Sequence, residues 1–229
     1  MGISISIATG LYGISFGALA VAAGLSVAQA MVLSLLMFTG GSQFAFIGVL
    51  ATGGGPPAAF GAATLLYVRN AIYGAQMNLL VRPGRLKWLA AHVTIDESAG
   101  TASVQESLAE RKVGFWVAGV GVFALWNVMT FVGALAGESM GDPAVWGLDG
   151  AAVAAFIALL WPRISKGNMA GIAVACAFVT FLAIPVVPSG VPIVISAVVA
   201  GTWGWVRAQQ VHRKSSSAQS TTSGQEGTL

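Results

Sequence analysis

The sequence has little charge and almost no cysteine. Charged residues make up 8% of its 229 residues, whereas 56% are hydrophobic. A typical soluble domain carries about 25% charged residues, so this composition excludes an ordinary soluble protein and indicates an integral membrane protein in contact with the lipid bilayer. The single cysteine, Cys176, excludes an internal disulfide and matches no metal motif. We interpret it as a packing residue.

Basic residues are absent from the N-terminal part of the sequence, where the first is Arg69. The opening stretch MGISISIATGLYG has no basic region ahead of its apolar residues, which predicts that the first helix is retained rather than cleaved as a signal peptide. The net charge of +3 needs no nucleic acid to explain it, because cytoplasmic Lys and Arg give a membrane protein the same excess. We therefore expect no nucleic-acid partner.

Long apolar runs dominate the sequence, and the fold prediction depends on them. We count seven apolar runs, several of which approach the roughly 20 residues that a membrane-spanning helix needs. They cover about 8–23, 28–50, 57–80, 113–137, 148–161, 169–187 and 190–207, with a weaker eighth near 88–104. We predict an all-α integral membrane protein with about seven transmembrane or re-entrant helices, whose residues 1–208 form a helical membrane transport domain. Residues 209–229 are rich in Ser, Thr, Gln and Gly, which predicts a disordered cytoplasmic tail.

The basic residues fall into four clusters that predict the topology. The clusters are Arg82/Arg85/Lys87, Arg111/Lys112, Arg163/Lys166 and Arg207/Arg213/Lys214. The positive-inside rule places all four in the cytoplasm, with a cytoplasmic C-terminus and the acidic loop 138–142 outside. Residues 88–104 must then be re-entrant or lie at the interface. The N-terminus is outside if three full crossings precede Arg82, and inside if residues 28–50 enter the membrane and return; both alternatives are open.

Interruptions in the apolar runs suggest an internal repeat. Three runs precede the central helix 113–137 and three follow it, the arrangement expected of two inverted three-helix repeats with broken helices. TGGSQ interrupts the second run, and AIPVVPSGVP separates the last two. Paired interruptions of this kind are typical of the binding site of a transporter.

The first interruption, within MFTGGSQFAF, is the strongest candidate for a binding site. Gly40, Gly41, Ser42 and Gln43 have two interpretations. They are either small residues that allow tight helix packing, or an unwound segment whose second half-helix points free N–H groups at an anion such as a substrate carboxylate. Gln43 favours the second interpretation, because packing glycines do not need an amide beside them.

Charged and polar residues in the other runs are candidates as well. Arg69 lies near the middle of its run, with Tyr73 on the same helical face and Asn70 beside it. A charge at membrane depth usually has a partner, so Arg69 either pairs with Asp96 or Glu97 or acts on the substrate directly. Asn127 either makes an interhelical hydrogen bond or lines a cavity. Two small-xxx-small patterns, Gly13–Gly17 and Gly133–Gly137, are interpreted as helix contacts.

The sequence HVTIDES contains the acidic pair Asp96 and Glu97. Carboxylates near membrane depth are typical proton-relay groups, so we predict that this pair accepts a proton or an amine. A continuous helix would bring His92 and Asp96 to one face, but two ligands without a third make a weak metal site. A loop at the headgroup level is the simpler interpretation of His92. We predict no metal and no cofactor.

Three motifs together resemble a known family. GISFGALAVAAGLSVAQAMVLSLLMFTGGSQFAFIGVL, VRNAIYG (68–74) and HVTIDESAG (92–100) are similar to elements of AzlC-type proteins, the large subunits of bacterial branched-chain amino acid exporters. The resemblance covers about residues 10 to 110. It implies export of apolar amino acids across the bacterial cytoplasmic (inner) membrane, driven by protons, with a small AzlD-type membrane subunit as partner.

These observations predict a secondary transporter rather than an enzyme. The predicted substrate-binding residues are Gly40, Gly41, Ser42, Gln43, Phe44, Arg69, Asn70, Tyr73 and Asn127, and the predicted proton-coupling residues are Asp96 and Glu97. Phe16, Phe44 and Phe46 are expected to hold an aliphatic side chain. The sequence lacks Gly-x-Ser-x-Gly and HExxH, which argues against a hydrolase. A passive channel or a structural subunit of a membrane complex is the main alternative, and a homo- or hetero-oligomer is compatible with either.

Overall fold

The computed structural model describes residues 1–139, 169–187, 191–192 and 194–206, together with the single residues 157, 161, 164 and 209. All regular secondary structure in these ranges is helical, so the all-α prediction is confirmed. The chain forms two compact units, Met1–Trp161 and Pro162–Leu229, which are described separately. The basic residues 163, 166, 207, 213 and 214 lie outside the described residues, as do most of the predicted run 148–161 and of the tail.

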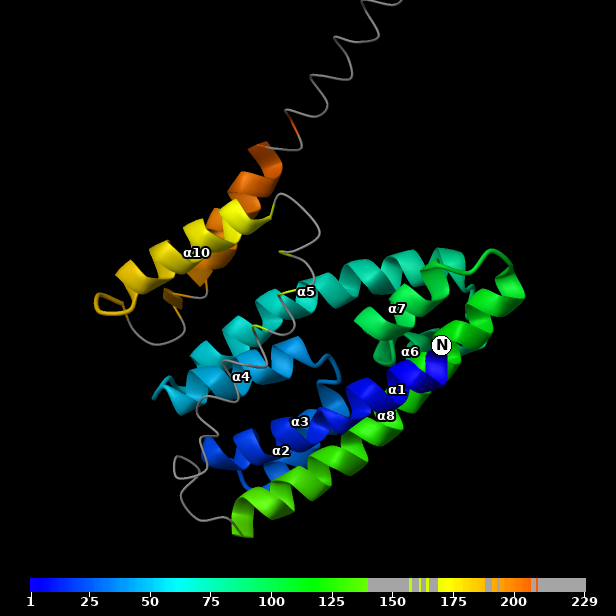
Figure 1. Cartoon of the computed structure of the whole chain (residues 1–229), viewed down its shortest axis with the longest axis horizontal. Coiled ribbons are helices and arrows are strands. Elements are labelled where there is room, and N and C mark those ends of the chain that lie inside the picture. Colours follow the sequence, from blue (N-terminus) through cyan, green and yellow to red (C-terminus); the bar gives the residue numbers. More distant parts are fainter. Residues whose placement is uncertain are drawn as a thin grey trace, which may run out of the picture. The chain divides into compact units, whose positions relative to one another are not determined.

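The first unit contains helices of very different lengths (Figure 1). They are α1 (Gly2–Leu11), α2 (Gly13–Ala22), α3 (Val27–Leu36), α4 (Gly41–Ala51), α5 (Pro56–Leu80), the 3-10 turn η1 (Gly84–Leu86), α6 (Lys87–His92), α7 (Asp96–Ser103) and α8 (Leu108–Ser139). Two stretches of the described residues are long and apolar enough to cross a membrane, namely Gly2–Ala22 and Leu108–Ser139.

The predicted run 28–50 is interrupted as expected, between α3 and α4. Ser26 begins α3 with a capping box, in which its hydroxyl accepts from the Gln29 N–H at 3.2 Å. The first turn of α3 and the last turn of α4 line one shared apolar cavity of about 610 Å³. The segment therefore enters the first unit and returns to the same end.

The weaker run 88–104 is also interrupted, between α6 and α7. Its turn, Val93 to Ile95, is buried. Ala90 of α6 and Ala102 of α7 belong to one core cluster with the end of α5 and the start of α8, so this segment enters and returns from the end opposite to that used by α3 and α4. The segment thus turns back within the first unit instead of running straight through it, and its predicted position relative to a membrane stays a prediction. His92 and Asp96 consequently do not share one continuous helix.

Glycines set the contact between α1, α2 and α8. A Cβ atom at Gly17 would overlap the backbone of Thr130, and one at Gly133 would overlap the backbone of Ile14. The two predicted small-xxx-small patterns thus pack against each other, and they let the helix backbones approach closely. Successive contacts run in the same order along both helices, from Gly2 at Val117 to Gly137 at Ala18, so α1–α2 and α8 are parallel.

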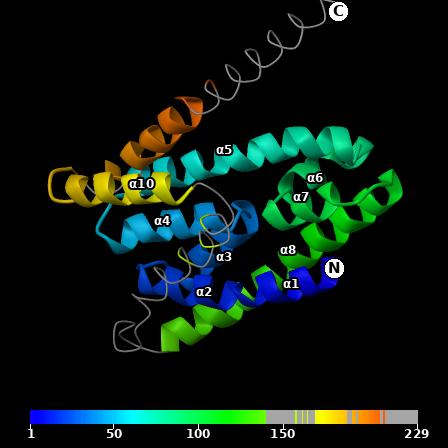
Figure 2. The same ribbon diagram turned by 45° about the horizontal axis from the view of Figure 1, so that its top comes forward.

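The remaining helices fill the space beside this pair. Figures 1 and 2 both show α4 alongside α5 and α7 alongside α8, in agreement with the contacts between these elements. In the first unit, the interrupted segment α3–α4 is followed by the long helix α5. The interrupted segment α6–α7 is followed in the same way by the long helix α8, in the opposite direction. This arrangement differs from the predicted repeat, which placed the second copy after 113–137.

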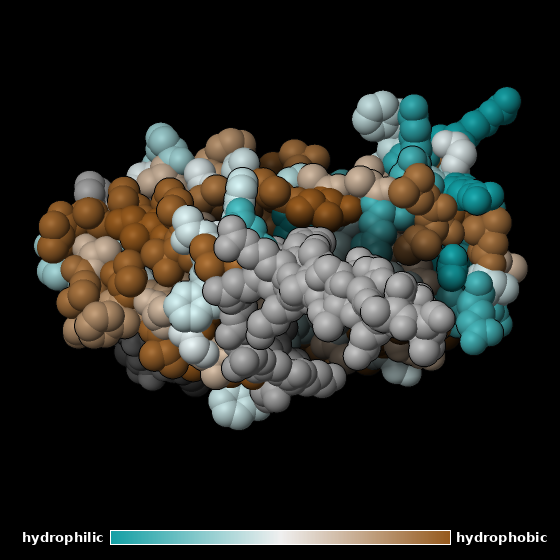
Figure 3. All heavy atoms as spheres, turned by 90° about the horizontal axis from the view of Figure 1, so that it is seen from above, coloured by the Kyte–Doolittle hydropathy of each residue, from teal (hydrophilic) through white to brown (hydrophobic). Residues whose placement is uncertain are grey.

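The outer surface of the first unit is largely apolar. Leu79, Ile72 and Phe60 are 73%, 64% and 61% exposed. Soluble monomers rarely expose apolar patches of such extent. Figure 3 shows hydrophilic side chains gathered at one end, where α5 ends and α8 begins. This distribution is the one expected of a protein that contacts lipid along its sides.

The second unit contains α10 (Ala170–Ala183) and the apolar helix Val194–Val206. The Cys176 thiol donates to the Ser196 carbonyl at 3.6 Å, and the hydroxyls of Thr180 and Ser196 are in contact. Cys176 therefore lies in a helix contact, as its interpretation as a packing residue expects. α10 ends at Ala183, the first residue of the predicted interruption AIPVVPSGVP.

Candidate functional site

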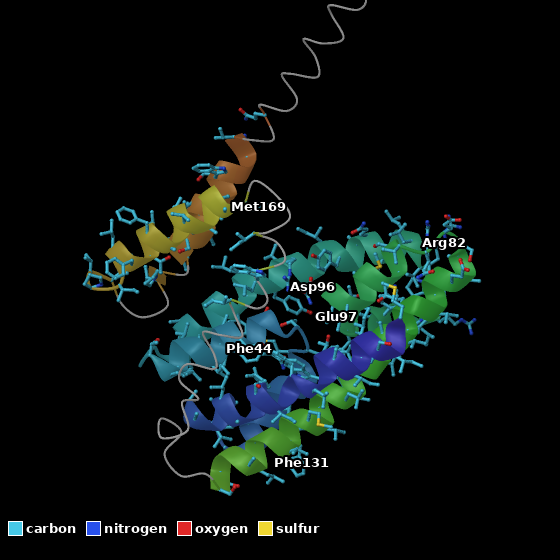
Figure 4. The ribbon with its side chains drawn as sticks, viewed as in Figure 1. Phe44, Arg82, Asp96, Glu97, Phe131 and Met169 are labelled. Carbon is cyan, nitrogen blue, oxygen red and sulfur yellow. The ribbon has the colours of Figure 1, made fainter. Side chains whose placement is uncertain are left out.

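The N-termini of α4 and α7 meet beside Arg69 of α5, in the interior of the first unit. Arg69 Nη1 lies 2.9 Å from Asp96 Oδ2, at the first residue of α7. A Cβ atom on Gly41, the first residue of α4, would lie 3.8 Å from Arg69 Nη2. Figure 4 shows Asp96, Glu97 and Phe44 in this central region, between α5 and the α1–α8 pair. One guanidinium thus faces both half-helices.

The break before α4 is held by two unusual features. Gly40 has φ +63° and ψ −83°, a backbone conformation that residues other than glycine rarely adopt. The Gly41 N–H donates to the Thr39 carbonyl at 2.8 Å across it, which makes a classic γ-turn. Gln43 is completely buried; its Oε1 accepts from the Gly40 N–H at 3.2 Å and its Nε2 donates to the Leu33 carbonyl at 3.3 Å. The Gln43 amide therefore fastens α3 to α4.

These bonds change which donors are available at the break. The Gly41 N–H is occupied by Thr39. The N–H groups of Ser42 and Gln43 make no hydrogen bond within the described part of the chain. The first turn of α4 contains no acidic residue. The positive end of this half-helix is thus not neutralised by its own sequence.

The N-terminus of α7 is built in the same way but carries charge. Its third residue, Ser98, accepts from the Ile95 N–H at 3.0 Å and donates to the Val93 carbonyl at 2.8 Å, as Gln43 does in α4. Asp96 and Glu97 occupy the first turn, however. The dipole of α7 is therefore compensated by the chain itself, whereas that of α4 is open to an external anion.

The ion pair of Arg69 is partly accessible. The side chains of Arg69 and Asp96 are 34% and 33% exposed. Arg69 Nε is buried without a hydrogen-bond partner among the described residues. The Tyr73 ring centroid lies 6.0 Å from the guanidinium carbon, as their spacing on one face predicts. Of the predicted partners of Arg69, Asp96 makes the ion pair.

Glu97 has different neighbours. The Thr9 hydroxyl of α1 donates to Glu97 Oε1 at 3.3 Å. Burial in the short, non-spanning α7 raises the pKa of the Glu97 carboxyl, as does the negative charge of Asp96. The backbone N–H of Glu97, the Thr9 hydroxyl and Arg69 oppose that rise. Nothing in the sequence pattern had indicated Thr9.

Two buried asparagines have one unsatisfied oxygen each. Asn70, 6% exposed, donates from Nδ2 to the Thr94 carbonyl at 3.1 Å. Asn127, 8% exposed, donates from Nδ2 to Phe123 of its own helix at 2.8 Å. Both Oδ1 atoms, and Thr39 Oγ1, are buried without a partner among the described residues. The described residues therefore show no interhelical hydrogen bond of Asn127, and its predicted role in lining a cavity stays a prediction.

An aromatic cluster adjoins the start of α4. The Phe16 ring lies 5.6 Å from Phe44 and 5.9 Å from Trp126, and Phe44 lies 6.2 Å from Trp126. Trp126 Nε1 is buried without a partner among the described residues. Phe46, which was expected in the same pocket, packs against the core cluster that contains Phe16, Phe44 and Trp126, and it also lines the apolar cavity between α3 and α4.

Among the described residues, no group of three or more His, Cys, Asp and Glu side chains is placed to hold a metal ion. The His92 ring instead packs against Phe38 and Phe123, at 6.3 and 5.4 Å between centroids. His92 therefore belongs to an aromatic contact at the turn of the second interrupted segment. His92 was expected in a loop, but it is the last residue of α6.

An all-helical chain with an apolar surface and two opposed half-helices that end at a charged centre has the features of a membrane transport protein. The sequence profile of the AzlC protein family matches residues 4–140, more than half of the chain, and the chain belongs to that family. The family is associated with transport and is not an enzyme family. The match includes α1 from its third residue, all of α2 to α8, and every residue of the candidate site. No curated protein and no solved structure matches the chain.

Proposed function

We propose that this protein is a secondary transporter that exports branched-chain or similar apolar amino acids across the bacterial cytoplasmic membrane in exchange for protons. The observation that carries the proposal is the open N-terminus of α4 beside Arg69. A carboxylate placed there accepts from the N–H groups of Ser42 and Gln43 and from the guanidinium. These donors combine charge, dipole and hydrogen bonds in a setting of low dielectric.

The aromatic cluster supplies the complement for an aliphatic side chain. Phe44 follows Gln43 directly, so a ligand bound at the first turn of α4 reaches the Phe16–Phe44–Trp126 cluster without crossing the unit. The amino group is matched by the carboxylates at the start of α7 and by the free oxygen of Asn70. An anion site, a cation site and an apolar pocket are the three elements that a zwitterionic apolar amino acid requires.

The orientation follows from the two re-entrant segments. They leave three full crossings, α1–α2, α5 and α8, and they bring the basic clusters at 82–87 and 111–112 to one end. The positive-inside rule makes this end cytoplasmic. Gly2, beside Val117, is nearer the start of α8 than its end, so the N-terminus is also cytoplasmic. The large exposed apolar surface accommodates lipid and the small AzlD-type subunit that we propose as partner.

Efflux from intact cells tests the transport function. Cells loaded with a leucine-containing dipeptide should release leucine faster when the protein and its small partner are present, and a protonophore should abolish the difference. Faster leucine release that is unchanged by the protonophore would instead support a passive channel. No difference in release would support a structural subunit.

Substitution of Gly41 tests the site itself. The space beside Gly41 admits a methyl group, since its nearest neighbours are Arg69 Nη2 and Leu66 Cδ2 at 3.8 Å. Gly41→Ala should therefore fold normally but fill the carboxylate position, and weaken leucine binding about tenfold or more, ~1.4 kcal/mol. Calorimetry on purified protein should show little change for 3-methylbutylamine, which is leucine without its carboxylate.

Gly48→Ala is the matched control, because Gly48 lies in the same helix with nothing near its Cβ position. It should bind both ligands like the wild type. If Gly41→Ala loses equal affinity for leucine and for the amine, or if that variant alone misfolds, the glycines have only a packing role.

A further inference from the structure

Asp96 and Glu97 are adjacent in sequence but have different partners. The Asp96 carboxylate pairs with Arg69 at 2.9 Å. The Glu97 carboxylate instead accepts from a neutral hydroxyl, that of Thr9, on a different helix. In a helix, consecutive side chains diverge by about 100°, so this separation is built into the backbone of α7.

We propose that Glu97 alone exchanges a proton for the substrate's ammonium group, while Asp96 stays ionised as the positioning partner of Arg69. The proposal rests on the transport function above and deepens it. In the exchange, the Oε–H bond of Glu97 breaks, its proton leaves to water, and the substrate ammonium takes its place against the carboxylate. No electron transfer and no further reactant is involved.

Asp96 is unsuited to carry the proton. Protonation would remove the negative partner of Arg69 and leave the guanidinium uncompensated, which is unfavourable although both side chains are about one-third exposed. The ion pair also holds the guanidinium at the N-terminus of α4, where the substrate carboxylate binds. Asp96 must therefore keep its charge throughout the cycle for the carboxylate site to persist.

Glu97 can exist in both states because its surroundings carry little charge. The groups that act on it are Arg69 from α5, which is already paired, and Asp96 from α7. α1 contributes the Thr9 hydroxyl and has no ionisable side chain, and α8 has none between Lys112 and Glu138. His92, at the end of α6, packs against aromatic rings. In the proposed cycle, Glu97 is neutral until an ammonium arrives.

A second observation points to a cation beside these carboxylates. Asn70 is 6% exposed, adjoins Arg69 in sequence and donates to Thr94, two residues before Asp96. Its Oδ1 is buried without a partner among the described residues. An ammonium group held by the Glu97 carboxylate would supply the donor that this oxygen lacks, since Lys-like ammonium groups offer three N–H bonds.

Proton release on binding tests the assignment. In weakly buffered detergent solution with a pH indicator, wild-type protein should release about one proton per leucine bound, by linkage. Glu97→Gln should release none and should bind leucine about tenfold more weakly at pH 8. It should bind 4-methylpentanoate, which is leucine without its amino group, within about twofold of wild type. Thr9→Val, which removes one donor to the ionised form, should move proton release to higher pH.

The possible failures are distinguishable. If wild-type protein binds neither leucine nor 4-methylpentanoate, the proposed transport function is wrong. If it binds both but Glu97→Gln still releases a proton, the assignment to Glu97 is wrong and the transport function stands. Asp96→Asn should weaken both ligands alike, because it displaces Arg69; loss of proton release in Asp96→Asn with full 4-methylpentanoate affinity would assign the proton to Asp96.

Discussion

Arg69 is the residue on which the charge balance of the site depends. It is positioned by Asp96 on one side and faces the open N-terminus of α4 on the other. Both members of the ion pair are about one-third exposed, so the pair is worth less than a fully buried one. We therefore expect the pair to make an intermediate contribution to stability and also to hold a cation in place beside α4.

Removal of the Arg69 charge should show how the pair contributes. Arg69→Leu should lower the free energy of unfolding in detergent by about 2 kcal/mol, between the values for exposed and buried pairs. The double variant Arg69→Leu/Asp96→Asn should recover most of that loss without recovering leucine binding. Arg85→Leu, an exposed arginine at the basic end, should be neutral. If Arg69→Leu alone is as stable as wild type, the pair has no structural role.

The two interrupted segments differ in how far the sequence predicts them. The first is marked by Gly40 and Gly41 in an apolar run, and glycine is the residue that positive φ requires. The second turns at Val93, Thr94 and Ile95, which include no glycine or proline. β-branched residues only mildly disfavour a helix, so tertiary contacts decide this break. The Thr9–Glu97 contact was unpredictable for a similar reason, since it joins residues distant in sequence.

The glycine contact between α2 and α8 gives a prediction at the scale of elements. Gly133→Ala places a Cβ atom into the backbone of Ile14, so the helices must separate and the free energy of unfolding should fall by about 2 kcal/mol or more. Gly74→Ala in α5, where nothing lies within 4 Å of the Cβ position, should be neutral or slightly stabilising. Equal thermal stability of the two purified variants would show that close approach is not needed.

At the scale of the whole molecule, the sequence leaves the N-terminal orientation open, and the proposed orientation uses the geometry of the first unit. Hydropathy identifies apolar runs, but it does not tell a membrane-spanning segment from a re-entrant one, because both can have the same composition. The shared cavity of α3 and α4 and the shared core of α6 and α7 show that both segments turn back within the first unit. The proposed topology therefore has three crossings between the N-terminus and Ser139.

Cysteine accessibility tests this topology. In a Cys176→Ala background, a cysteine at Ser139, which is exposed, should react with an impermeant maleimide in intact cells. A cysteine at Arg85, also exposed but at the basic end, should react only after permeabilisation. The opposite pattern would reverse the orientation of the first unit, and labelling of both sites in intact cells would contradict three crossings.

The shortness of α6 and α7 bears on how the chain enters a membrane during synthesis. With six and eight residues, these helices are about 9 and 12 Å long, against a hydrocarbon core of about 30 Å. Neither can be retained there alone, because the exposed polar backbone of their turn would face lipid. They must be accepted after α5 is in place and enclosed when α8 follows. The charged centre is thus assembled last, so we expect a nascent chain cut short before α8 to lack an enclosed charged centre.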